Sequence, residues 1–321
     1  MTNVPRPPQL DLGLRDRVIF WALVGVLHGL SLLPDFVLYR LGVLGGWVAY
    51  LFDRGHLRVG MRNLEIAFPE HAETARRRIL RASYVNLGRA GAEYIRLAGF
   101  SYQRLKHRVS YSGLEHWDAL RRKYPSKGIL AVAAHIGNFE LLAPAHAMHG
   151  YPISLVHHSL RFAAGEALMT FVRERAGVQI IRKHRAARQM LRTLQRGEVI
   201  GIPFDQNAKR SEAVWVPFFG VLAATPSGLD RIALLSGAPV VSVFMVRQPD
   251  GRSHVIEISD EIKQQRSADP QADVLENTRR YQQAIEQAVR RHPEQFLWTH
   301  RRYRTRPVRG TPSIYQPPRR N

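Results

Sequence analysis

The sequence contains no cysteine among its 321 residues. This absence excludes disulfide bridges and thiolate metal sites, and it fits a cytosolic environment. The sequence also has no internal repeat with a period of 20–50 residues, which excludes the common repeat architectures. A chain of this length can bury a substantial core, either as one large α/β domain or as two small ones.

Acidic residues are scarce: 26 Asp and Glu stand against 47 Lys and Arg, so the formal net charge is +21. Such a surface favours a polyanion, which can be nucleic acid, an anionic membrane leaflet or a phosphorylated substrate. No motif that reads DNA or RNA is present, and the basic residues are not interleaved with stacking aromatics. We therefore expect no nucleic-acid partner, although charge alone leaves open a non-enzymatic binder of membranes or nucleic acid.

No uninterrupted apolar run reaches the roughly 20 residues that a membrane-spanning helix needs. Residues 18–33 carry no formal charge and end at Pro34, and a second apolar stretch, 36–52, is broken only by Arg40. A cleaved signal peptide is not favoured, because Asp11 and Asp16 dilute the basic lead. The two stretches form either a buried helical hairpin or a membrane anchor or interfacial helix. We favour a membrane anchor or an interfacial helix over a buried hairpin.

From Gly128 onward, strand-like and helical patterns alternate along the chain. The strand-like runs are 128–134, 152–157, 178–182, 198–204, 238–246 and 254–258. The helical runs are 139–149, 165–176, 185–196, 226–236 and 272–291. This alternation predicts an α/β fold with a mixed, mostly parallel sheet flanked by helices. Sites in such sheets lie at the carboxyl ends of strands, where His135 and Asp205 both fall.

The sequence outside this region divides the chain further. Residues 63–99 predict a turn and a long amphipathic helix. The stretch 299–321 holds seven arginines and no acid, and its Pro and Gly content disfavours regular structure. We therefore predict a membrane-associating segment (1–60), a catalytic domain (61–305) and a basic Pro/Arg-rich tail (306–321).

The segment "AAHIGNFE" (133–140) ends a buried strand on a histidine and places a carboxylate five residues later. If Gly137 and Asn138 make a turn, with Asn138 as the N-cap of a helix, the chain can fold His135 and Glu140 together. Glu140 would then accept the Nδ1 proton of His135 and leave Nε2 free as a general base. No serine or cysteine lies beside His135, so direct attack by a substrate hydroxyl is favoured over a covalent enzyme intermediate. The alternative is a strand-end histidine bound by backbone and a solvated glutamate.

Several ordered motifs resemble one family. "HIGNFELL" resembles the H-x4-D/E motif of glycerolipid acyltransferases, and the chain as a whole resembles the bacterial lipid A biosynthesis acyltransferases, the lauroyl and myristoyl transferases. The other matching segments are "RNLEIAFPE" (62–70), "NLGRAGAEY" (86–94), "IPFDQN" (202–207), "VPFFGVLAATPSGLDRIALLSGAPVV" (216–241) and "FLWTHRRYRTRP" (296–307).

The resemblance implies transfer of a fatty acyl chain from acyl carrier protein to a hydroxyl of a phosphorylated glucosamine disaccharide. In that reading His135 is the general base and Glu140 is its orienting partner. The resemblance also implies a place at the inner (cytoplasmic) membrane, with the catalytic domain on the cytoplasmic face among anionic lipids. We expect no cofactor and no metal. Alternative acceptors are another glycolipid, such as a phosphatidylinositol mannoside, or a lysophospholipid, with acyl-CoA as a possible donor.

Further residues are predicted to bind substrate. Asp205 and Gln206 stand in the loop that the family keeps near its active site, and we add Asn138 from the turn after His135. An arginine after the second strand is expected to steady the acyl donor. Where relatives read Tyr-Arg-Pro this chain has "VHHSLRF" (156–162), with His158 at the arginine's position. Arg161 is our first choice for that arginine and Arg173 our second.

Three predictions concern the last third of the chain. Arg301 and Arg302 can pair with substrate phosphates, because the guanidinium fork matches phosphate oxygens. "PFFG" (217–220) predicts a turn that lines the acyl groove. Thr225 is expected to cap the helix that follows.

Overall fold

The computed structural model describes residues 12–99, 105–157, 159–182 and 186–316. Its α-helices are α1 (Leu14–Ser31), α2 (Asp35–Phe52), α3 (Arg54–Ala67), α4 (Glu73–Ala98), α6 (Leu114–Lys123), α7 (Phe139–Met148), α8 (Ala163–Arg175), α9 (Ala186–Gln195), α10 (Gly228–Ser236) and α11 (Pro270–Arg291). Its strands are β1 (Val109–Ser112), β2 (Ile129–Ala133), β3 (Ile153–His157), β4 (Val178–Arg182), β5 (Val199–Pro203), β6 (Ala213–Phe218), β7 (Val221–Pro226), β8 (Val240–Arg247) and β9 (His254–Ile258). Two short 3-10 helices, η1 (Arg210–Glu212) and η2 (Pro293–Gln295), complete the elements in these ranges.

Seven of the described strands form one sheet, in the order β1-β9-β8-β2-β5-β3-β4. The pairs β8–β2, β2–β5, β5–β3 and β3–β4 are parallel, and β9 runs antiparallel to β8. The predicted mixed, mostly parallel sheet is therefore confirmed. Strands β6 and β7 form a separate antiparallel hairpin.

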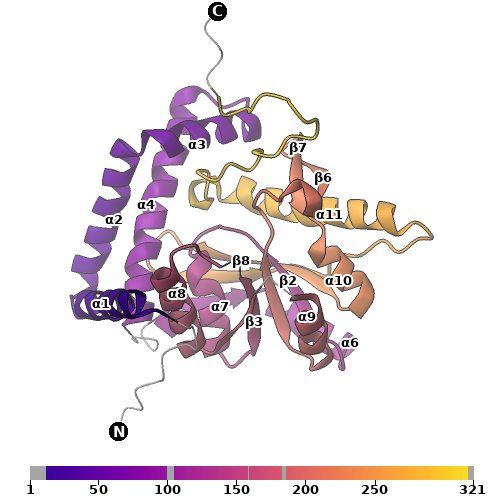
Figure 1. Cartoon of the computed structure of the whole chain (residues 1–321), viewed down its shortest axis with the longest axis horizontal. Coiled ribbons are helices and arrows are strands. Elements are labelled where there is room, and N and C mark those ends of the chain that lie inside the picture. Colours follow the sequence, from indigo (N-terminus) through magenta and orange to yellow (C-terminus); the bar gives the residue numbers. More distant parts are fainter. Residues whose placement is uncertain (1–11, 100–104, 158, 183–185, 317–321) are drawn as a thin grey trace, which may run out of the picture.

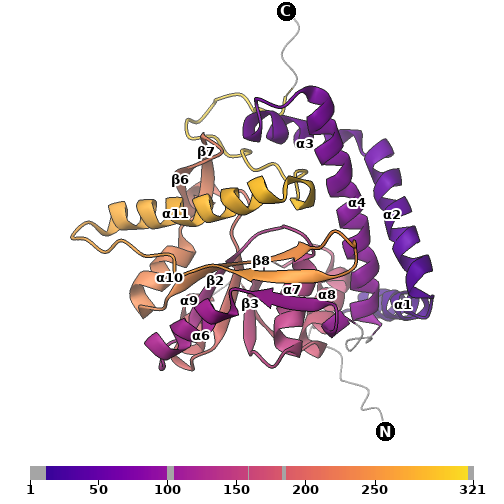
Figure 2. The ribbon, with the colours of Figure 1, turned by 180° about the vertical axis from the view of Figure 1, so that it is seen from behind.

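Helices cover the sheet on each side (Figures 1 and 2), and the central strands β2 and β8 are buried on both faces. Along β2, Leu130 and Val132 join a cluster with buried residues of α9, α10 and α11. The alternate residues Ile129, Ala131 and Ala133 join a second cluster with residues of α6, α7 and α8. Successive strand residues point to opposite faces, so β2 is apolar throughout and lies in the middle of three layers.

The elements predicted from Gly128 onward are all present, with ends that move by at most a few residues. The hairpin β6–β7, strand β1 and helix α6 were not predicted. The hairpin strands are antiparallel and β1 has only four residues, so none of them adds to the alternation of strands and helices that guided the prediction. Phe219 and Gly220 form the turn of the hairpin at positive φ, which confirms a turn at "PFFG".

The predicted cap at Thr225 is wrong. Helix α10 begins only at Gly228, after Ser227, and Thr225 lies near the end of β7. Its buried hydroxyl accepts a hydrogen bond from Arg302 Nη2 (2.6 Å). A residue that is still paired in a strand cannot supply the N-cap of a helix two residues further on.

The N-terminal apolar stretches form α1 and α2, and α2 lies alongside the long helix α4 (Figure 1). The contact is close: a Cβ on Gly42 would lie 2.6 Å from the carbonyl oxygen of Gly88, and one on Gly46 would lie 2.5 Å from that of Tyr84. In the described part of the chain, α2 is the helix that is long and apolar enough to cross a membrane.

Parts of four predictions lie outside the described residues. These parts are residues 1–11 of the N-terminal segment, His158, residue 185 of the helical run 185–196, and residues 317–321 of the tail. The predicted boundary between residues 60 and 61 falls inside α3. The division of the chain into three parts stays a prediction.

Candidate active site

The parallel pairing of β2 and β5 brings His135 and Asp205 together, two residues beyond the end of each strand. Asp205 Oδ1 lies 2.8 Å from His135 Nδ1, and Asp205 Oδ2 accepts a hydrogen bond from the backbone N–H of His135 (3.3 Å). The Asp205 side chain is 2% exposed and that of His135 is 17% exposed. The carboxylate is thus shielded from water, while part of the imidazole remains exposed to solvent.

The electrostatics of the pair fit a proton-accepting imidazole. Burial alone would lower the pKa of His135, but the adjacent Asp205 carboxylate, with a smaller effect from Glu140, raises that pKa above its ordinary value. Burial alone would raise the pKa of Asp205, but His135 holds it below its ordinary value. Because ionised Asp205 accepts the Nδ1 proton, the lone pair of neutral His135 lies on Nε2.

The turn that follows His135 has a strict backbone requirement. Gly137 adopts φ +63°, and a Cβ there would lie 1.8 Å from the carbonyl oxygen of Met245. Asn138 Oδ1 then accepts the backbone N–H of Leu141 (3.1 Å), which confirms Asn138 as the N-cap of α7. The amide nitrogen of Asn138 donates to Glu93, and the side chain is 1% exposed. Protein groups therefore occupy both amide atoms of Asn138, which was predicted to bind substrate.

Glu140 does not hold the Nδ1 proton of His135, contrary to the prediction. Asp205 takes that position, and Glu140 instead accepts from Arg173 Nη2 through both carboxylate oxygens (3.1 and 2.8 Å). The reason is geometric: α7 starts only at Phe139. Its first turn carries Glu140 toward α8, whereas Asp205 follows the strand next to β2.

Arg173 belongs to a buried chain of hydrogen bonds. Its Nη1 lies 3.0 Å from His157 Nδ1, and His157 Nε2 lies 2.8 Å from Glu166 Oε2. A guanidinium only donates, so His157 accepts at Nδ1 and donates from Nε2 to Glu166. This arrangement fixes Arg173 against Glu140.

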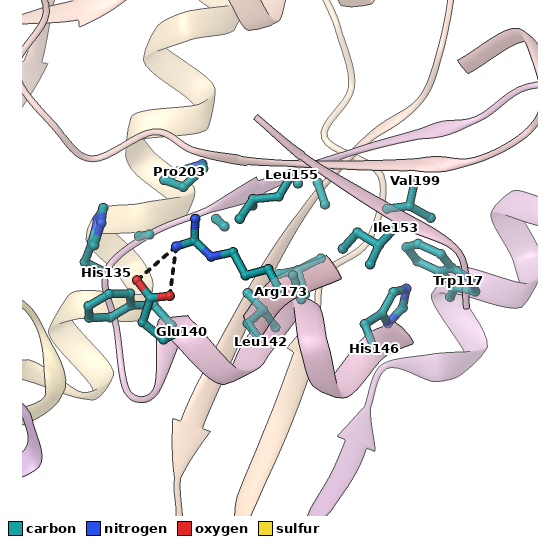
Figure 3. A pocket seen from close by; sticks show the side chains of 17 residues that line it. Trp117, His135, Glu140, Leu142, His146, Ile153, Leu155, Arg173, Val199 and Pro203 are labelled. Carbon is teal, nitrogen blue, oxygen red and sulfur yellow. Dashed lines mark hydrogen bonds and ion pairs between the residues drawn. The ribbon is translucent and has the colours of Figure 1, made fainter. Parts of the chain in front are cut away.

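A pocket with mostly apolar walls starts beside His135 and runs between the sheet and α7 (Figure 3). His135, Glu140 and Arg173 lie at one end, and Trp117, His146, Ile153 and Val199 lie at the other. The remaining wall residues are Ala131, Ala133, Ala134, Phe139, Leu142, Ala143, Leu155, Gly201, Pro203 and Val243. Burial, helped by His149 and Arg121, lowers the pKa of His146 to about 4. His146 is therefore neutral at pH 7, and the far end of the pocket carries no charge.

"PFFG" contributes no residue to the walls of this pocket. Phe218 and Phe219 instead pack into the core cluster on the other side of the sheet. The turn was predicted correctly, but it does not line this pocket, and its place along an acyl groove stays a prediction.

The rim beside His135 is built from the loop after β5 and from the C-terminal segment. Gln206 Nε2 lies 3.3 Å from His135 Nε2, so the predicted Gln206 reaches the nitrogen that carries the lone pair. His300 Nε2 accepts the backbone N–H of Asn207 (3.0 Å) and ties the two segments together. Burial lowers the pKa of His300 to about 4. His300 was not predicted, although it stands in the quoted motif "FLWTHRRYRTRP".

The structure separates the four predicted arginines. Arg173 lines the pocket, whereas the exposed Arg161 lies between β3 and α8 and is not part of the pocket wall. Arg301 is exposed near the rim.

Arg302 differs from its prediction. It is 3% exposed and donates to Ala224 O (2.8 Å), Thr225 Oγ1 and Gln282 Oε1 (3.0 Å). Its donors hold β7 and α11 together, so the fold directs the guanidinium inward, away from any substrate phosphate.

This arrangement combines a polarised imidazole with a pocket suited to a hydrocarbon chain. Such a site can take a proton from a hydroxyl at the pocket mouth while an apolar chain lies between the sheet and α7. The family described as bacterial lipid A biosynthesis acyltransferase matches residues 11–305.

Individual relatives cover almost the full length. The lipid A biosynthesis lauroyltransferase of Escherichia coli K12 is 30% identical over 317 residues, 98% of this chain and 100% of the relative. The palmitoleoyltransferase of the same strain is 29% identical over 92% of this chain and 94% of its own length. Its myristoyltransferase is 24% identical over 93% of this chain and 91% of its own length.

Proposed function

The chain belongs to the bacterial lipid A biosynthesis acyltransferase family, and we propose that it moves a fatty acyl chain from a carrier-protein thioester to a hydroxyl of a phosphorylated glucosamine disaccharide lipid. Family membership supports an acyltransferase of late lipid A acylation. The observation that carries the proposed chemistry is the His135–Asp205 pair at the mouth of an apolar pocket.

The proposed mechanism follows from the lone pair on His135 Nε2. This nitrogen takes the proton of the acceptor hydroxyl as the oxygen attacks the thioester carbonyl. The new C–O bond forms a tetrahedral oxyanion, the C–S bond then breaks, and His135 returns the proton to the departing thiolate. Asp205 stabilises the imidazolium between these steps. No group of the enzyme is acylated.

We assign the acyl chain to the pocket and the acyl donor to the side of Arg173. The guanidinium lies in the wall next to His135 and is oriented by Glu140 and His157. A fixed cation at this place is suited to steady the developing oxyanion, since preorganised positive groups act strongly in a site shielded from water. In this proposal Glu140 acts through Arg173.

The acceptor lies on the rim side. Arg301 is exposed beside the segment that carries His300, and we propose that it pairs with a phosphate of the disaccharide. Gln206 is within reach of the attacking oxygen because it adjoins His135 Nε2. The net charge of +21 suits both a phosphorylated acceptor and an acidic carrier protein.

We also propose that α1 and α2 place the enzyme on the inner membrane, with the site on the cytoplasmic face. Large apolar side chains of both helices face solvent. They are Leu14, Val18, Trp21, Val26, Phe36, Leu41, Leu44, Trp47, Val48, Leu51 and Phe52. So much exposed apolar surface on two adjoining helices is typical of a membrane-contacting face.

Purified enzyme should acylate a radiolabelled phosphorylated disaccharide lipid when it receives acyl carrier protein thioesters of several chain lengths. His135→Ala removes the base and should lower the rate by at least about 10³-fold. The exposed His107→Ala is the matched control and should keep wild-type activity. Folded wild-type protein that transfers no chain to this acceptor would contradict the proposed function. The same assay with acyl-CoA identifies the donor.

The pocket also predicts which residue limits the chain length. Gly201 of β5 lies in the wall, and a Cβ there would make ordinary contacts with Leu155 Cδ1 (3.5 Å) and Ile153 Cδ1 (3.7 Å). Gly201→Ala should therefore fold normally, and Gly201→Val should occupy space that the acyl chain needs. For Gly201→Val we expect shorter donors to be preferred, with a change of about 10-fold or more in the ratio of kcat/KM between donors. Unchanged donor ratios in folded Gly201→Val protein would place the chain elsewhere.

A further inference from the structure

The motif "NLGRAGAEY" (86–94) lies on α4, outside the pocket, and the proposed reaction gives it no role. Two of its side chains nevertheless reach the turn that follows His135. Glu93 is 0% exposed and Asn86 is 7% exposed, so both act inside the protein. A buried carboxylate is costly unless it is paired and hydrogen-bonded, and its surroundings therefore indicate what it holds.

Polar side chains from four other elements surround Glu93. Tyr39 OH of α2 donates to Oε1 (2.7 Å), and Arg247 of β8 donates to both oxygens. Asn138 Nδ2, at the start of α7, donates to Oε2 (2.5 Å). His254 Nε2 of β9 lies 3.3 Å from Oε2. The carboxylate thus joins the cap of α7 to β8, β9 and α2.

A second set of bonds holds the backbone of the same turn. Asn86 Nδ2 donates to the carbonyl oxygen of Gly137 (3.0 Å), and Asn86 Oδ1 accepts from Arg247 Nε (2.8 Å). The N–H of Gly137 donates to the carbonyl oxygen of Gln295 (3.0 Å), and the Gln295 side chain pairs with the backbone of Arg247. Both peptide groups of Gly137 are therefore tied to one buried cluster.

We propose that Glu93 is a positioning residue for His135. It acts through Asn138: the Glu93–Asn138 bond fixes the turn 136–138, and the turn fixes the angle at which His135 leaves β2 and meets Asp205. The effect on the rate rests on the proposed function, whereas the effect on the His135–Asp205 pair does not. A misplacement of about 1 Å in a catalytic group can cost roughly 10²-fold in rate, so a clamp at this point has a large effect.

The charge state of Glu93 agrees with this role. Burial would raise the pKa of Glu93, but His254 and Arg247 lower it to about 2. The carboxylate is therefore ionised at every pH at which the enzyme works, and it remains an acceptor for the Asn138 amide.

The first test separates the clamp from the cap. In Asn138→Ser the hydroxyl can still accept the N–H of Leu141 as an N-cap, but the donor to Glu93 is lost. We expect kcat to fall by about 30- to 100-fold, with little change in the KM of the acyl donor. Asp269→Ser is the matched control, because Asp269 caps α11 in the same way and is exposed. The control should retain wild-type kcat.

The second test exchanges the two partners. Glu93→Gln and Asn138→Asp each disturb the charge of the cluster, with no carboxylate in one case and two in the other. The double variant restores a single carboxylate and an amide donor at opposite ends of the same bond. We expect the kcat of the double variant to be at least about 10-fold higher than that of the less active single variant.

The readout that does not depend on activity is the titration of His135, followed by NMR of ¹⁵N-labelled histidine rings. Loss of the clamp should bring the pKa of His135 down toward its ordinary value, because the ring loses its fixed contact with Asp205. A folded Asn138→Ser protein with wild-type titration and wild-type kcat would overturn the proposal. A wild-type protein that acylates no lipid A precursor would overturn the proposed function and leave the titration as the test of positioning.

Discussion

Asp205→Asn should lower kcat by about 10³- to 10⁴-fold, because an amide that donates to Nδ1 would place the proton of His135 on Nε2, where the base is needed. The substitution keeps the size of a side chain that is almost fully buried and hydrogen-bonded to the backbone N–H of His135. Steady-state kinetics with a saturating acyl donor measures the effect. Circular dichroism on the same preparation gives the thermal midpoint of unfolding and shows whether the variant is folded at the assay temperature.

Glu140→Gln is the comparison that separates the two carboxylates. Glu140 binds Arg173 rather than His135, so its loss should reduce kcat by less than the loss of Asp205 does. A larger effect of Glu140→Gln than of Asp205→Asn would restore Glu140 as the orienting partner of His135.

The same pair of variants gives a pH test with a defined sign. His135 acts as a base only when it is neutral, so activity falls as pH drops through its pKa. Asp205 raises that pKa above the ordinary value of about 6.5, and the acidic limb of the wild-type profile should lie above pH 6.5. Asp205→Asn removes the raising charge, so its residual activity should persist to lower pH. Identical acidic limbs would show that another group titrates.

Arg247→Met should lower the free energy of unfolding by about 3–5 kcal/mol, because it leaves the buried Glu93 carboxylate without the guanidinium that binds both of its oxygens. Arg247 is 5% exposed and Glu93 is 0% exposed, so water cannot replace the lost donors. Urea unfolding followed by circular dichroism gives the value. Arg291→Met removes an arginine from a half-exposed ion pair with Glu257 and should cost less than about 1 kcal/mol.

Arg247→Met should weaken the pH dependence of stability that Glu93 contributes in the wild type. In the wild type, the pKa of Glu93 is lowered to about 2. The stability that Glu93 contributes is therefore present above its unfolded pKa of about 4.3 and is lost as pH falls toward 2. Without Arg247 the folded pKa of Glu93 should rise, so the stability difference between wild type and variant should shrink as pH falls through that raised pKa. A constant difference in stability between variant and wild type as pH falls from 7.5 to about 3 would contradict this account.

The sequence predicted the sheet well because a parallel sheet with helices on both faces leaves a strong local pattern. Strands β2 and β5 are short apolar runs, and the rule that sites lie at carboxyl ends of strands pointed to both His135 and Asp205. The hairpin β6–β7 leaves no such pattern. Its strands contain apolar residues, but no helical run separates them, so the alternation of strands and helices does not mark them.

The pairing inside the site could not be read from the sequence. His135 and Glu140 are close in the sequence, so their pairing could be suggested from the sequence alone. The distance in space between His135 and Asp205 depends on which strand pairs with β2, which the sequence does not show. The partner of Arg302 likewise depends on the approach of β7 and α11. The buried cluster around Glu93 contains residues from five elements that lie far apart in the chain. The motif "NLGRAGAEY" therefore pointed to the segment that holds Glu93, but it could not indicate which residues Glu93 contacts.

The close packing of α2 on α4 has a consequence for which lipids the enzyme can reach. Gly42 and Gly46 let the two backbones touch, and Asp35 binds Arg96 and Arg108, so α2 is held along its length. Its partner α4 exposes Arg77, Arg78 and Arg81, which hydrocarbon excludes. If α2 stays packed on α4 at the proposed membrane, it would lie along the surface rather than cross. The enzyme would draw its acceptor from one leaflet alone, and lipid on the opposite leaflet would become a substrate only after it has flipped.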